Sequence, residues 1–414
     1  MKENYFMRQD ADRIIKASIN AVLPDEAVKK ALVNKDFGKG RVYLVAAGKA
    51  AWQMAKTAVD TIGDRIETGI VITKYNHVNG DIPKVRCYEA GHPVPDMNSF
   101  TATKAAIDLV SDLDKEDTIL FLLSGGGSAL FESPLVSGEE LADITNQLLA
   151  SGADIVEINT IRKRFSKVKG GKFAKLCAPA SIYSIVLSDI LGDPLDMIAS
   201  GPAYPDMSTC EQAVSIAKKY KLTLSENQWK LLNEETPKSV SNVETIVTGS
   251  VRNLCRAAYD ECKLLGYEPV ILTDMLSCEA REAGRFLSAI AASNQNSDKS
   301  IAYIAGGETV VHLTGNGKGG RNQELTLAAA IGLENCVDTA VFSVGSDGTD
   351  GPTDAAGGYA DENTIQTLKE KKINVYEVLK NNDAYNALKE TDGLIITGAT
   401  GTNVNDVSVL LIKR

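Results

Sequence analysis

The chain has 414 residues, of which 44% are hydrophobic and 24% are charged, and its formal net charge at pH 7 is −10. This length exceeds the size at which a single core usually stops growing, so it favours two domains. The acidic balance argues against a general surface for nucleic acid or an anionic membrane, and no apolar run approaches the roughly 18 residues of a membrane-spanning helix. The seven cysteines are scattered without a C-x-x-C pair, which favours reduced thiols and a cytoplasmic location.

The first predicted strand introduces a candidate catalytic lysine. Residues 5–33 show helical spacing, and the apolar run 42–45 predicts a strand that leads through Ala46-Ala47-Gly48-Lys49-Ala50-Ala51 into a helix over 52–62. Lys49 is therefore expected at the edge of the sheet where open α/β folds bind ligands. The alternative is an ordinary surface lysine, but the small neighbouring residues leave the amine of Lys49 uncrowded.

A glycine-rich turn follows the most apolar of the next strands. Strands are expected over 69–74, 85–89 and 118–121, and the last of them leads into Ser124-Gly125-Gly126-Gly127-Ser128. Glycine lets the backbone approach a ligand, and successive N–H groups attract a phosphate or carboxylate. The alternative is a tight turn without a ligand. His92, in a proline-rich loop, is a candidate acid or base, although such histidines more often hydrogen-bond the backbone.

A concentrated basic segment follows the helix predicted over 138–150, for which Ser137 is a plausible cap. Residues 162–175 contain seven basic side chains and no acidic one. In an acidic protein, such a segment favours binding of a polyphosphate or a carboxylate. A solvated helix face or a nucleic-acid patch is the alternative, which Gly170-Gly171 and the scarcity of aromatic residues make less favoured.

The end of the first half is marked by another strand and a candidate metal ligand. Asp189 follows a strand predicted over 182–187, where a carboxylate is well placed to bind Mg²⁺ or to accept a hydroxyl proton. Capping of the next turn is the competing explanation for Asp189. The polar segment 234–242 marks the domain boundary, so we expect domains over 1–236 and 243–414.

The second half continues the alternation of strands, helices and glycine-rich turns. Strands are expected over 244–248, 269–273, 300–304, 310–313, 339–344, 394–397 and 407–412, and helices over 251–265 and 277–293. Gly315, Gly317 and Gly320 match G-x-G-x-x-G, but the short preceding strand and the polar residues that follow argue against a dinucleotide site. There is no G-x-x-x-x-G-K-[ST] motif and no G-x-S-x-G motif.

Together, these features place anion-binding turns, basic side chains and aspartates at the carboxyl ends of strands. This combination fits phosphoryl transfer, which depends mainly on positioning and charge neutralisation. From the residues alone, the chain is predicted to be a two-domain α/β enzyme that acts on an anionic substrate, with a kinase as the leading interpretation.

Several long motifs make the chain resemble the class II glycerate kinases, the family with a C-terminal MOFRL domain. The similarity spans nearly the whole chain and is carried by residues 47–51, 123–130, 159–171, 187–201, 306–324, 345–357 and 401–406. The resemblance implies ATP-dependent, Mg²⁺-assisted phosphorylation of D-glycerate at its 2-hydroxyl, giving 2-phosphoglycerate. It also implies a Rossmann-like N-terminal domain and a smaller α/β domain, with the active site in the interdomain cleft.

The resemblance also assigns roles to individual positions. Lys49 and Arg321 match the family's catalytic lysine and arginine, and Asp189 is a candidate for metal binding or proton acceptance. The turn Ser124 to Ser128 would hold phosphate or glycerate. The rest of the expected substrate-binding and nucleotide-binding set is Asn159, Arg162, Lys169, Glu308, Asn322, Asp347 and Asp350. Where the family commonly has Arg-Lys-His, this chain has Arg162-Lys163-Arg164, which weakens any proposal of a histidine base there.

Two other functions stay open from the sequence. One is an NAD(P)H-dependent hydroxypyruvate reductase, a name that relatives of this family have carried, and the other is a non-catalytic metabolite sensor. We expect small-molecule substrates and neither nucleic-acid nor membrane partners. The oligomeric state is not determined by the sequence, and a homo-oligomer is compatible with it.

Overall fold

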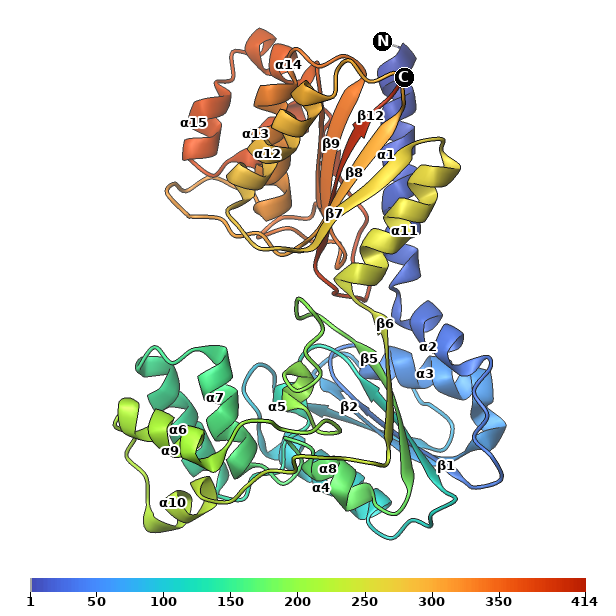
Figure 1. The fold of residues 1–414 in the computed structure, drawn as a ribbon, viewed down its shortest axis with the longest axis vertical. Helices are drawn as coiled ribbons and strands as arrows, with labels where there is room; N and C mark the ends of the chain where they lie inside the picture. The colour runs from blue at the N-terminus through green and yellow to red at the C-terminus, as the bar shows by residue number, and fades with distance from the viewer. Residues whose placement is uncertain (1) are drawn as a thin grey trace. The chain divides into compact units, whose positions relative to one another are not determined.

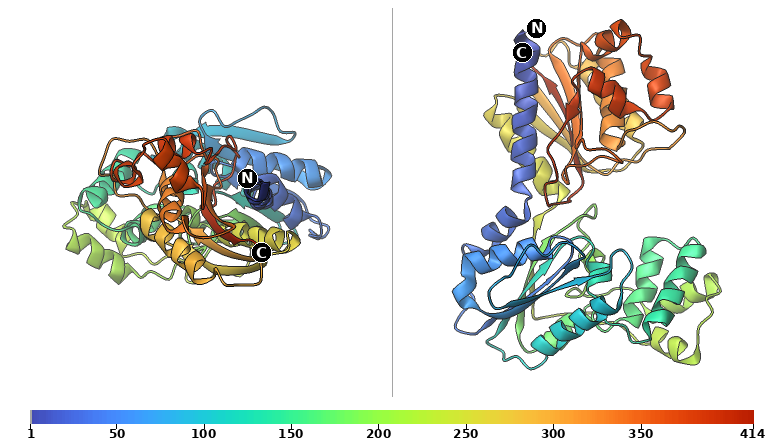
Figure 2. Two further views of the ribbon diagram at one scale, coloured as in Figure 1. Left: turned by 90° about the horizontal axis from the view of Figure 1, so that it is seen from above. Right: turned by 180° about the vertical axis from the view of Figure 1, so that it is seen from behind.

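The computed structural model describes residues 2–414, and the contacts within it divide the chain into two compact units. One unit is Ala27–Thr248, and the other combines Met1–Glu26 with Gly249–Arg414. The expected division at 236 and 243 differs from this one in two places: the first helix is grouped with the C-terminal half, and residues 243–248 with the N-terminal half. Figures 1 and 2 show the elements of each unit.

The unit Ala27–Thr248 is built on a six-stranded sheet with the order β3-β2-β1-β4-β5-β6. The first five strands in this order are parallel to one another. Their bounds are β1 Val42–Ala47, β2 Ile66–Lys74, β3 Val85–Ala90, β4 Thr118–Leu123 and β5 Ser181–Leu187, and β6 is Val243–Gly249. The central strands β1 and β4 are apolar almost throughout because both of their faces are covered.

Helices cover the two faces of this sheet. Tyr43, Val45 and Ala47 of β1 pack with α4 (Met97–Val110) and α8 (Lys172–Cys177), whereas the alternate residues of β1 pack with α2 (Pro24–Leu32) and α3 (Ala51–Ile62). A separate cluster of helices, labelled α6, α7, α9 and α10 in Figure 1, has its own apolar core. It consists of α6 (Gly138–Ala150), α7 (Ile155–Arg162), α9 (Cys210–Lys219) and α10 (Glu226–Leu232). Ser137 caps α6 as predicted, because its side chain accepts a hydrogen bond from the Glu140 N–H.

The other unit has a mixed six-stranded sheet with the order β11-β10-β9-β12-β8-β7. Only β7 and β8 pair in parallel, and the other neighbours are antiparallel. The strands are β7 Glu268–Leu276, β8 Ile301–Gly307, β9 Thr339–Gly345, β10 Gly357–Asp361, β11 Leu394–Ile395 and β12 Asp406–Ile412. Because β12 runs antiparallel to both of its neighbours, its first residue, Asp406, lies opposite Gly307 and Gly345, the last residues of β8 and β9.

Two pairs of helices enclose this second sheet. Figure 1 shows α12 (Ala280–Ser293) and α13 (Arg321–Leu333) on one face, and α1 (Lys2–Ala21) and α11 (Val251–Leu264) on the other. The short helices α14 (Thr364–Glu370), α15 (Val375–Lys380) and α16 (Ala384–Glu390) pack against α13. The helix expected over 5–33 is broken at Pro24, where α2 begins.

The strand expected over 310–313 is wrong. Val310 makes only an isolated bridge to Glu279, and the chain is irregular from there to α13. The backbone groups of this segment are satisfied by residues that precede α16: the Thr314 and Gly315 N–H groups donate to Asn382 Oδ1, at 2.7 and 3.0 Å. These long-range side-chain contacts replace the pairing that a strand would provide.

Candidate active site

The first group of candidate residues surrounds the glycine turn after β4, and we call it the lysine patch: Lys49, His92, Ser124, Gly125, Gly126 and Asp189. Ala47 of β1 pairs with Leu123 of β4, so the turns after these strands leave the sheet side by side. The Lys49 N–H donates to Gly125 O at 2.8 Å, and the Ala50 N–H donates to Ser124 Oγ at 3.0 Å. The structure thus brings Lys49 and the serine-glycine turn together.

The glycines of this turn are required by close contacts. A Cβ at Gly125 would lie 2.2 Å from Asp189 Oδ2, and a Cβ at Gly126 would lie 3.1 Å from His92 Nε2 and 3.2 Å from Lys49 Cγ. Gly126 also has φ +86°, a conformation that side chains disfavour. The absence of a Cβ at both positions lets the side chains of Lys49, His92 and Asp189 gather around one turn.

His92 is a titratable group in this patch. The sequence made it a candidate acid or base, although its proline-rich loop favoured a hydrogen bond to the backbone. Burial, and then the charges of Lys49 and Lys74, lower the pKa of His92 below its ordinary value. A lowered pKa favours the neutral ring, which is the form that can accept a proton. His92 lies beside Lys49 because β3, the strand that precedes it, pairs with β2 at the edge of the sheet. Local sequence patterns do not predict such a tertiary contact.

A second group, which we call the serine patch, continues from the same turn and consists of Ser128, Asn159, Arg162 and Ser200. Ser128 Oγ lies 3.1 Å from Ser200 Oγ, and Ser200 Oγ donates to Asn159 Oδ1 at 3.2 Å. Arg162 Nη2 donates to Ser128 O at 3.5 Å. Ser200 has φ +61°, a strained conformation that such contacts must stabilise. Hydroxyl, amide and guanidinium groups side by side are suited to binding a carboxylate.

The basic segment 162–175 is mostly used inside the fold, contrary to the expectation that it forms an open anion site. Lys163 Nζ donates to Asp206 Oδ1 at 3.2 Å, and the Arg164 guanidinium donates to Thr160 O and to Ser208. Lys169 is completely buried and donates to Ser128 O at 2.7 Å and Phe131 O at 3.2 Å. Lys169 therefore supports the serine patch from behind instead of presenting its charge to solvent. A run of basic residues in a sequence does not reveal such burial.

The third group lies in the other unit, and we call it the arginine patch: Glu308, Arg321, Asn322, Asp347, Asp350 and Asp406. Arg321, the first residue of α13, donates from Nε to Asp406 Oδ2 at 2.6 Å and from Nη2 to Asp406 Oδ1 at 3.1 Å. Its Nη1 donates to Glu308 Oε1 at 2.9 Å. Burial opposes the charge of Arg321, but the hydrogen bonds with Asp406 outweigh it and raise the pKa of Arg321. The guanidinium is thus permanently charged and fixed in direction.

Asp350 holds the beginning of α13 in place. Its carboxylate accepts the N–H groups of Asn322 at 3.1 Å and Gln323 at 2.8 Å, which are two of the donors that a helix start leaves unpaired. Burial raises the pKa of Asp350 to about 6, although these two N–H groups oppose the shift. Asp350 and Asn322 are both buried, which differs from the expected direct contact with a ligand.

Asp347 occupies the turn after β9, and its exposure is intermediate. Its Oδ1 accepts the Thr349 N–H at 2.9 Å. A Cβ at Gly345 would lie 3.4 Å both from Asp347 Oδ1 and from Asp406 Oδ1, so the two carboxylates flank the same glycine. Asp406, which sequence reasoning did not select, is thus central to this patch; its only sequence signal was its place at the end of the polar motif 401–406.

The glycines of the G-x-G-x-x-G match are explained by packing. A Cβ at Gly315 or Gly317 would lie 2.4 or 2.5 Å from atoms of Asn381, and one at Gly320 would lie 2.3 Å from Asp350. The Gly317 N–H also donates to Asn381 O at 2.8 Å. Close approach of the backbone to residues 381–383 therefore accounts for this pattern without a nucleotide.

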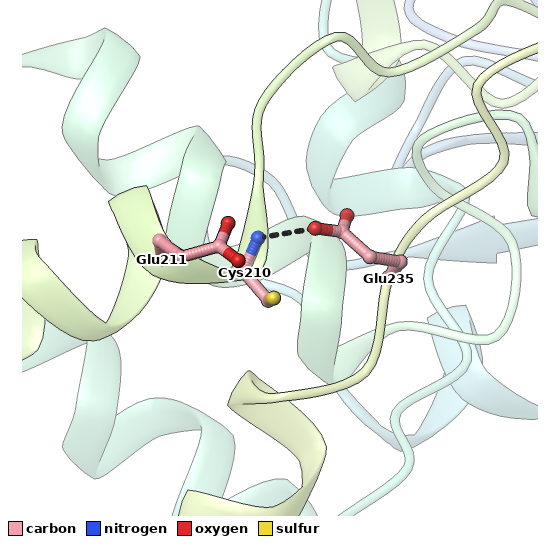
Figure 3. Close-up of side chains that lie close together, drawn as sticks. All are labelled: Cys210, Glu211 and Glu235. Carbon is pink, nitrogen blue, oxygen red and sulfur yellow. Dashed lines mark hydrogen bonds between the residues drawn. The ribbon is translucent and has the colours of Figure 1, made fainter.

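Among the described side chains, one group of three potential metal ligands has its ligand atoms within 4.8 Å of one another: Cys210, Glu211 and Glu235. Figure 3 shows that the Glu235 carboxylate accepts the Cys210 N–H, at 2.7 Å. Glu235 also pairs with Lys238 at 2.6 Å, and this hydrogen bond lowers the pKa of Glu235 to about 2. The hydrogen bond to Glu235 raises the pKa of the Cys210 thiol. A protonated thiol beside an already paired carboxylate is a poor metal ligand.

Two further features concern the helices and the cysteines. None of the helices in residues 2–414 is long and apolar enough to cross a lipid bilayer. All seven cysteines are free thiols, as the sequence predicts.

Comparisons with known proteins identify relatives over the whole chain. Residues 10–233 match a domain of unknown function, DUF4147, and residues 301–406 match the MOFRL family. The chain is 52% identical to a D-glycerate 2-kinase of Thermotoga maritima, over 98% of both chains, and 38% identical to a putative hydroxypyruvate reductase of Agrobacterium vitis, over 90% of this chain and 100% of that protein. A crystal structure of a Thermotoga maritima glycerate kinase superposes with a TM-score of 0.94, covering 99% of this chain and 100% of that one at 52% identity.

Proposed function

Because this chain belongs to the glycerate kinase family that carries a MOFRL domain, we propose that it transfers the γ-phosphoryl group of ATP to the 2-hydroxyl of D-glycerate. The products are ADP and 2-phosphoglycerate. The observation that carries this proposal is the 52% identity to a D-glycerate 2-kinase along 98% of both chains. The lysine, serine and arginine patches supply the chemical groups that the reaction requires.

The charge of the transferring group is neutralised by Lys49 and Arg321. In phosphoryl transfer, negative charge spreads over the oxygens of the γ-phosphoryl group, so fixed cations stabilise the transition state more than the ground state. The bidentate pairing with Asp406 holds the Arg321 guanidinium at the start of α13. That Lys49 and Arg321 act in the same transition state is a prediction, which follows from membership of this family.

Glycerate is oriented by the serine patch, and its proton is removed in the lysine patch. Arg162, Ser128 and Ser200 bind the carboxylate of glycerate. The neutral His92 ring accepts the proton of the 2-hydroxyl as the new O–P bond forms and the bond between the γ-phosphorus and the bridging oxygen of ADP breaks. His92 is supported in this role by its lowered pKa and its contact with Gly126.

A magnesium ion fits beside Asp189. Mg²⁺ is typically bound by one or two carboxylates together with substrate phosphates, and the Asp189 carboxylate lies against the backbone of Gly125. Asp189 would hold the ion there. When bound, the ion neutralises the charge of the β- and γ-phosphates. We also place the enzyme in the cytoplasm, which seven free thiols support.

One pair of assays tests the proposed function against the reductase. Purified protein with ATP, Mg²⁺ and D-glycerate should yield 2-phosphoglycerate, which phosphorus NMR distinguishes from 3-phosphoglycerate. With NADH and hydroxypyruvate, the absorbance of NADH should not change. Oxidation of NADH without phosphorylated product would favour the reductase. The Agrobacterium vitis relative, which is named a putative hydroxypyruvate reductase, is the reason for testing this alternative. Glycerate binding without either reaction would indicate a sensor.

A further inference from the structure

A buried carboxylate, Glu132, lies beneath the serine patch. Its side chain has no exposed surface, and Lys169, at 3.3 Å from Nζ to Oε2, has none either. Arg162 Nη2 lies 4.0 Å from the same oxygen, and the Arg162 side chain is 13% exposed. Of these three charged residues, only Arg162 is accessible to a ligand.

Both cations hold the backbone of the patch. Lys169 Nζ and Arg162 Nη2 donate to the same carbonyl oxygen, that of Ser128, at 2.7 and 3.5 Å. The hydroxyl of Ser128 in turn contacts Ser200, which is hydrogen-bonded to Asn159. Displacing either cation would therefore move the serine that faces the substrate.

Glu132 acts on these cations through its charge. Among the described residues, neither oxygen of Glu132 accepts a hydrogen bond of standard geometry. A carboxylate that is buried in this way is tolerated only when cations compensate it, and the cations are equally dependent on the carboxylate. The three residues leave a net charge of +1, which matches the single carboxylate of glycerate.

We infer that Glu132 is a positioning residue, which holds Lys169 and Arg162 in place by its charge and so fixes Ser128 and Ser200 for binding the glycerate carboxylate. This inference rests on the proposed function. It concerns glycerate affinity at a given pH and makes no demand on ATP binding.

The charges that face Lys169 determine how it responds to pH. Burial lowers the pKa of Lys169 to about 8, Glu132 opposes this shift, and Arg162 adds to it. The neighbouring Lys172 also has a pKa lowered to about 8, by burial and then by Arg164, while Glu132 opposes the shift. Loss of the Glu132 charge therefore lowers the pKa of Lys169 further, and its ammonium is lost at a lower pH.

The test is the KM for D-glycerate and the KM for ATP between pH 6 and pH 9 in wild type, Glu132→Gln and Lys169→Met. In wild type, the KM for glycerate should rise above about pH 8, and in Glu132→Gln the rise should begin about one pH unit lower. In Lys169→Met, the KM for glycerate should be high at every pH, without the alkaline rise. The KM for ATP should be the same in all three.

Two control variants make the result decisive. Lys172→Met and Glu157→Gln should keep the wild-type profile, because the Lys172 amine binds the carbonyls of Lys163, Arg164 and Ser166, and Glu157 pairs with Lys219 on the surface. An unshifted profile in Glu132→Gln, or an alkaline rise that persists in Lys169→Met, would overturn the inference. If Glu132→Gln does not fold, Lys169→Met alone decides. Absence of phosphoglycerate with the wild type would instead refute the proposed function.

Discussion

The candidate residues differ in how firmly the fold holds them. Arg321 is bound by two carboxylates, and its side chain is 32% exposed, so it is fixed in place but not fully buried. The backbone of Lys49 is fixed at the glycine turn, because its N–H donates to Gly125 O at 2.8 Å. His92 owes its neutral state to burial and two nearby lysines. These environments suit a fixed charge at Arg321 and a proton acceptor at His92.

Replacing His92 tests the proton acceptor. His92→Asn should lower kcat at pH 7.5 by about 100-fold or more, the contribution usual for a general base, and leave the KM for ATP unchanged. In wild type, kcat should fall as the pH decreases through the lowered pKa of His92, and this acid limb should be absent in the variant. His312→Asn, at an exposed histidine, serves as the control. If His92→Asn kept the wild-type kcat, another group would accept the proton of the 2-hydroxyl, and Asp189 would be the next candidate.

Asp350 should make the stability of its unit depend on pH. Because its pKa is about 6 in the folded protein and about 4 in an unfolded chain, the folded state binds the proton more tightly, and this stabilisation is lost as the pH rises from about 4 to about 6. Over this pH range, the free energy of unfolding of the wild type should fall by about 3 kcal/mol relative to that of Asp350→Asn. This corresponds to about 1.4 kcal/mol for each unit of pKa difference.

Hydrogen exchange in peptides of α13 and β9 measures this loss within the unit concerned. Asp112→Asn, at an exposed aspartate of the other unit, should leave those peptides unaffected at every pH. If the exchange of these peptides differed between wild type and Asp350→Asn by the same amount at pH 4 and at pH 7, the raised pKa of Asp350 would be contradicted.

At the scale of elements, the turn between β4 and α5 (Gly127–Leu130) combines an unusual conformation with close contacts. Gly126 and Gly152 both have positive φ, at +86° and +76°, but only Gly126 would place a Cβ near other atoms. Substitution of Gly152 therefore measures the cost of backbone strain alone, whereas substitution of Gly126 adds the effect on the lysine patch.

We expect Gly126→Ala and Gly152→Ala to lose similar stability, about 1–2 kcal/mol, because alanine is strained at positive φ. Only Gly126→Ala should also lower kcat, by about 10-fold or more, since its methyl group would displace His92 and Lys49. Thermal unfolding and steady-state kinetics on both variants check this. Equal kcat values would mean that the turn contributes to the fold alone.

The sequence predicted most elements because their signals are local. Continuous apolar runs marked β1 and β4, and Ser137 marked the start of α6, whose cap is confirmed. Lys49 and the serine-glycine turn were recognised because each directly follows such a run. The false strand at 310–313 and the buried Lys169 were not foreseeable in this way, because their partners lie elsewhere in the chain. Asn382 donates to His312 O at 3.1 Å, and Glu132 lies 3.3 Å from the Lys169 amine.

At the scale of the whole molecule, the chain does not divide at a single point. Ala11 and Ile14 of α1 are completely buried, Tyr267 Oη donates to Asp10 at 2.8 Å, and Thr402 Oγ1 donates to Val22 O at 2.9 Å. A first helix that completes the C-terminal unit has no local signature, so the periodicity of residues 5–33 alone could not assign it. The claim that the patches of both units share one cleft stays a prediction.

Fragments test this organisation. Residues 27–248, which contain both tryptophans, should unfold cooperatively when expressed alone, as followed by their fluorescence. Residues 249–414 should bind a hydrophobic dye and lack a sharp thermal transition until a peptide of residues 1–26 is added, because α1 covers one face of the sheet (Figure 1). Each large aliphatic side chain that α1 buries contributes about 1.5–3 kcal/mol. A stable, dye-free 249–414 fragment would contradict this account.

The proposal that Lys49 and Arg321 stabilise one transition state is tested most directly by a double-mutant cycle. The kcat/KM for D-glycerate would be measured for wild type, Lys49→Ala, Arg321→Ala and the double variant, with Lys56→Ala as a surface control. Each single substitution should reduce kcat/KM by about 100-fold or more, and the double variant should be little worse than either, because residues that act as a unit are not additive. Losses that add in free energy within about 0.5 kcal/mol would show that the two residues act independently.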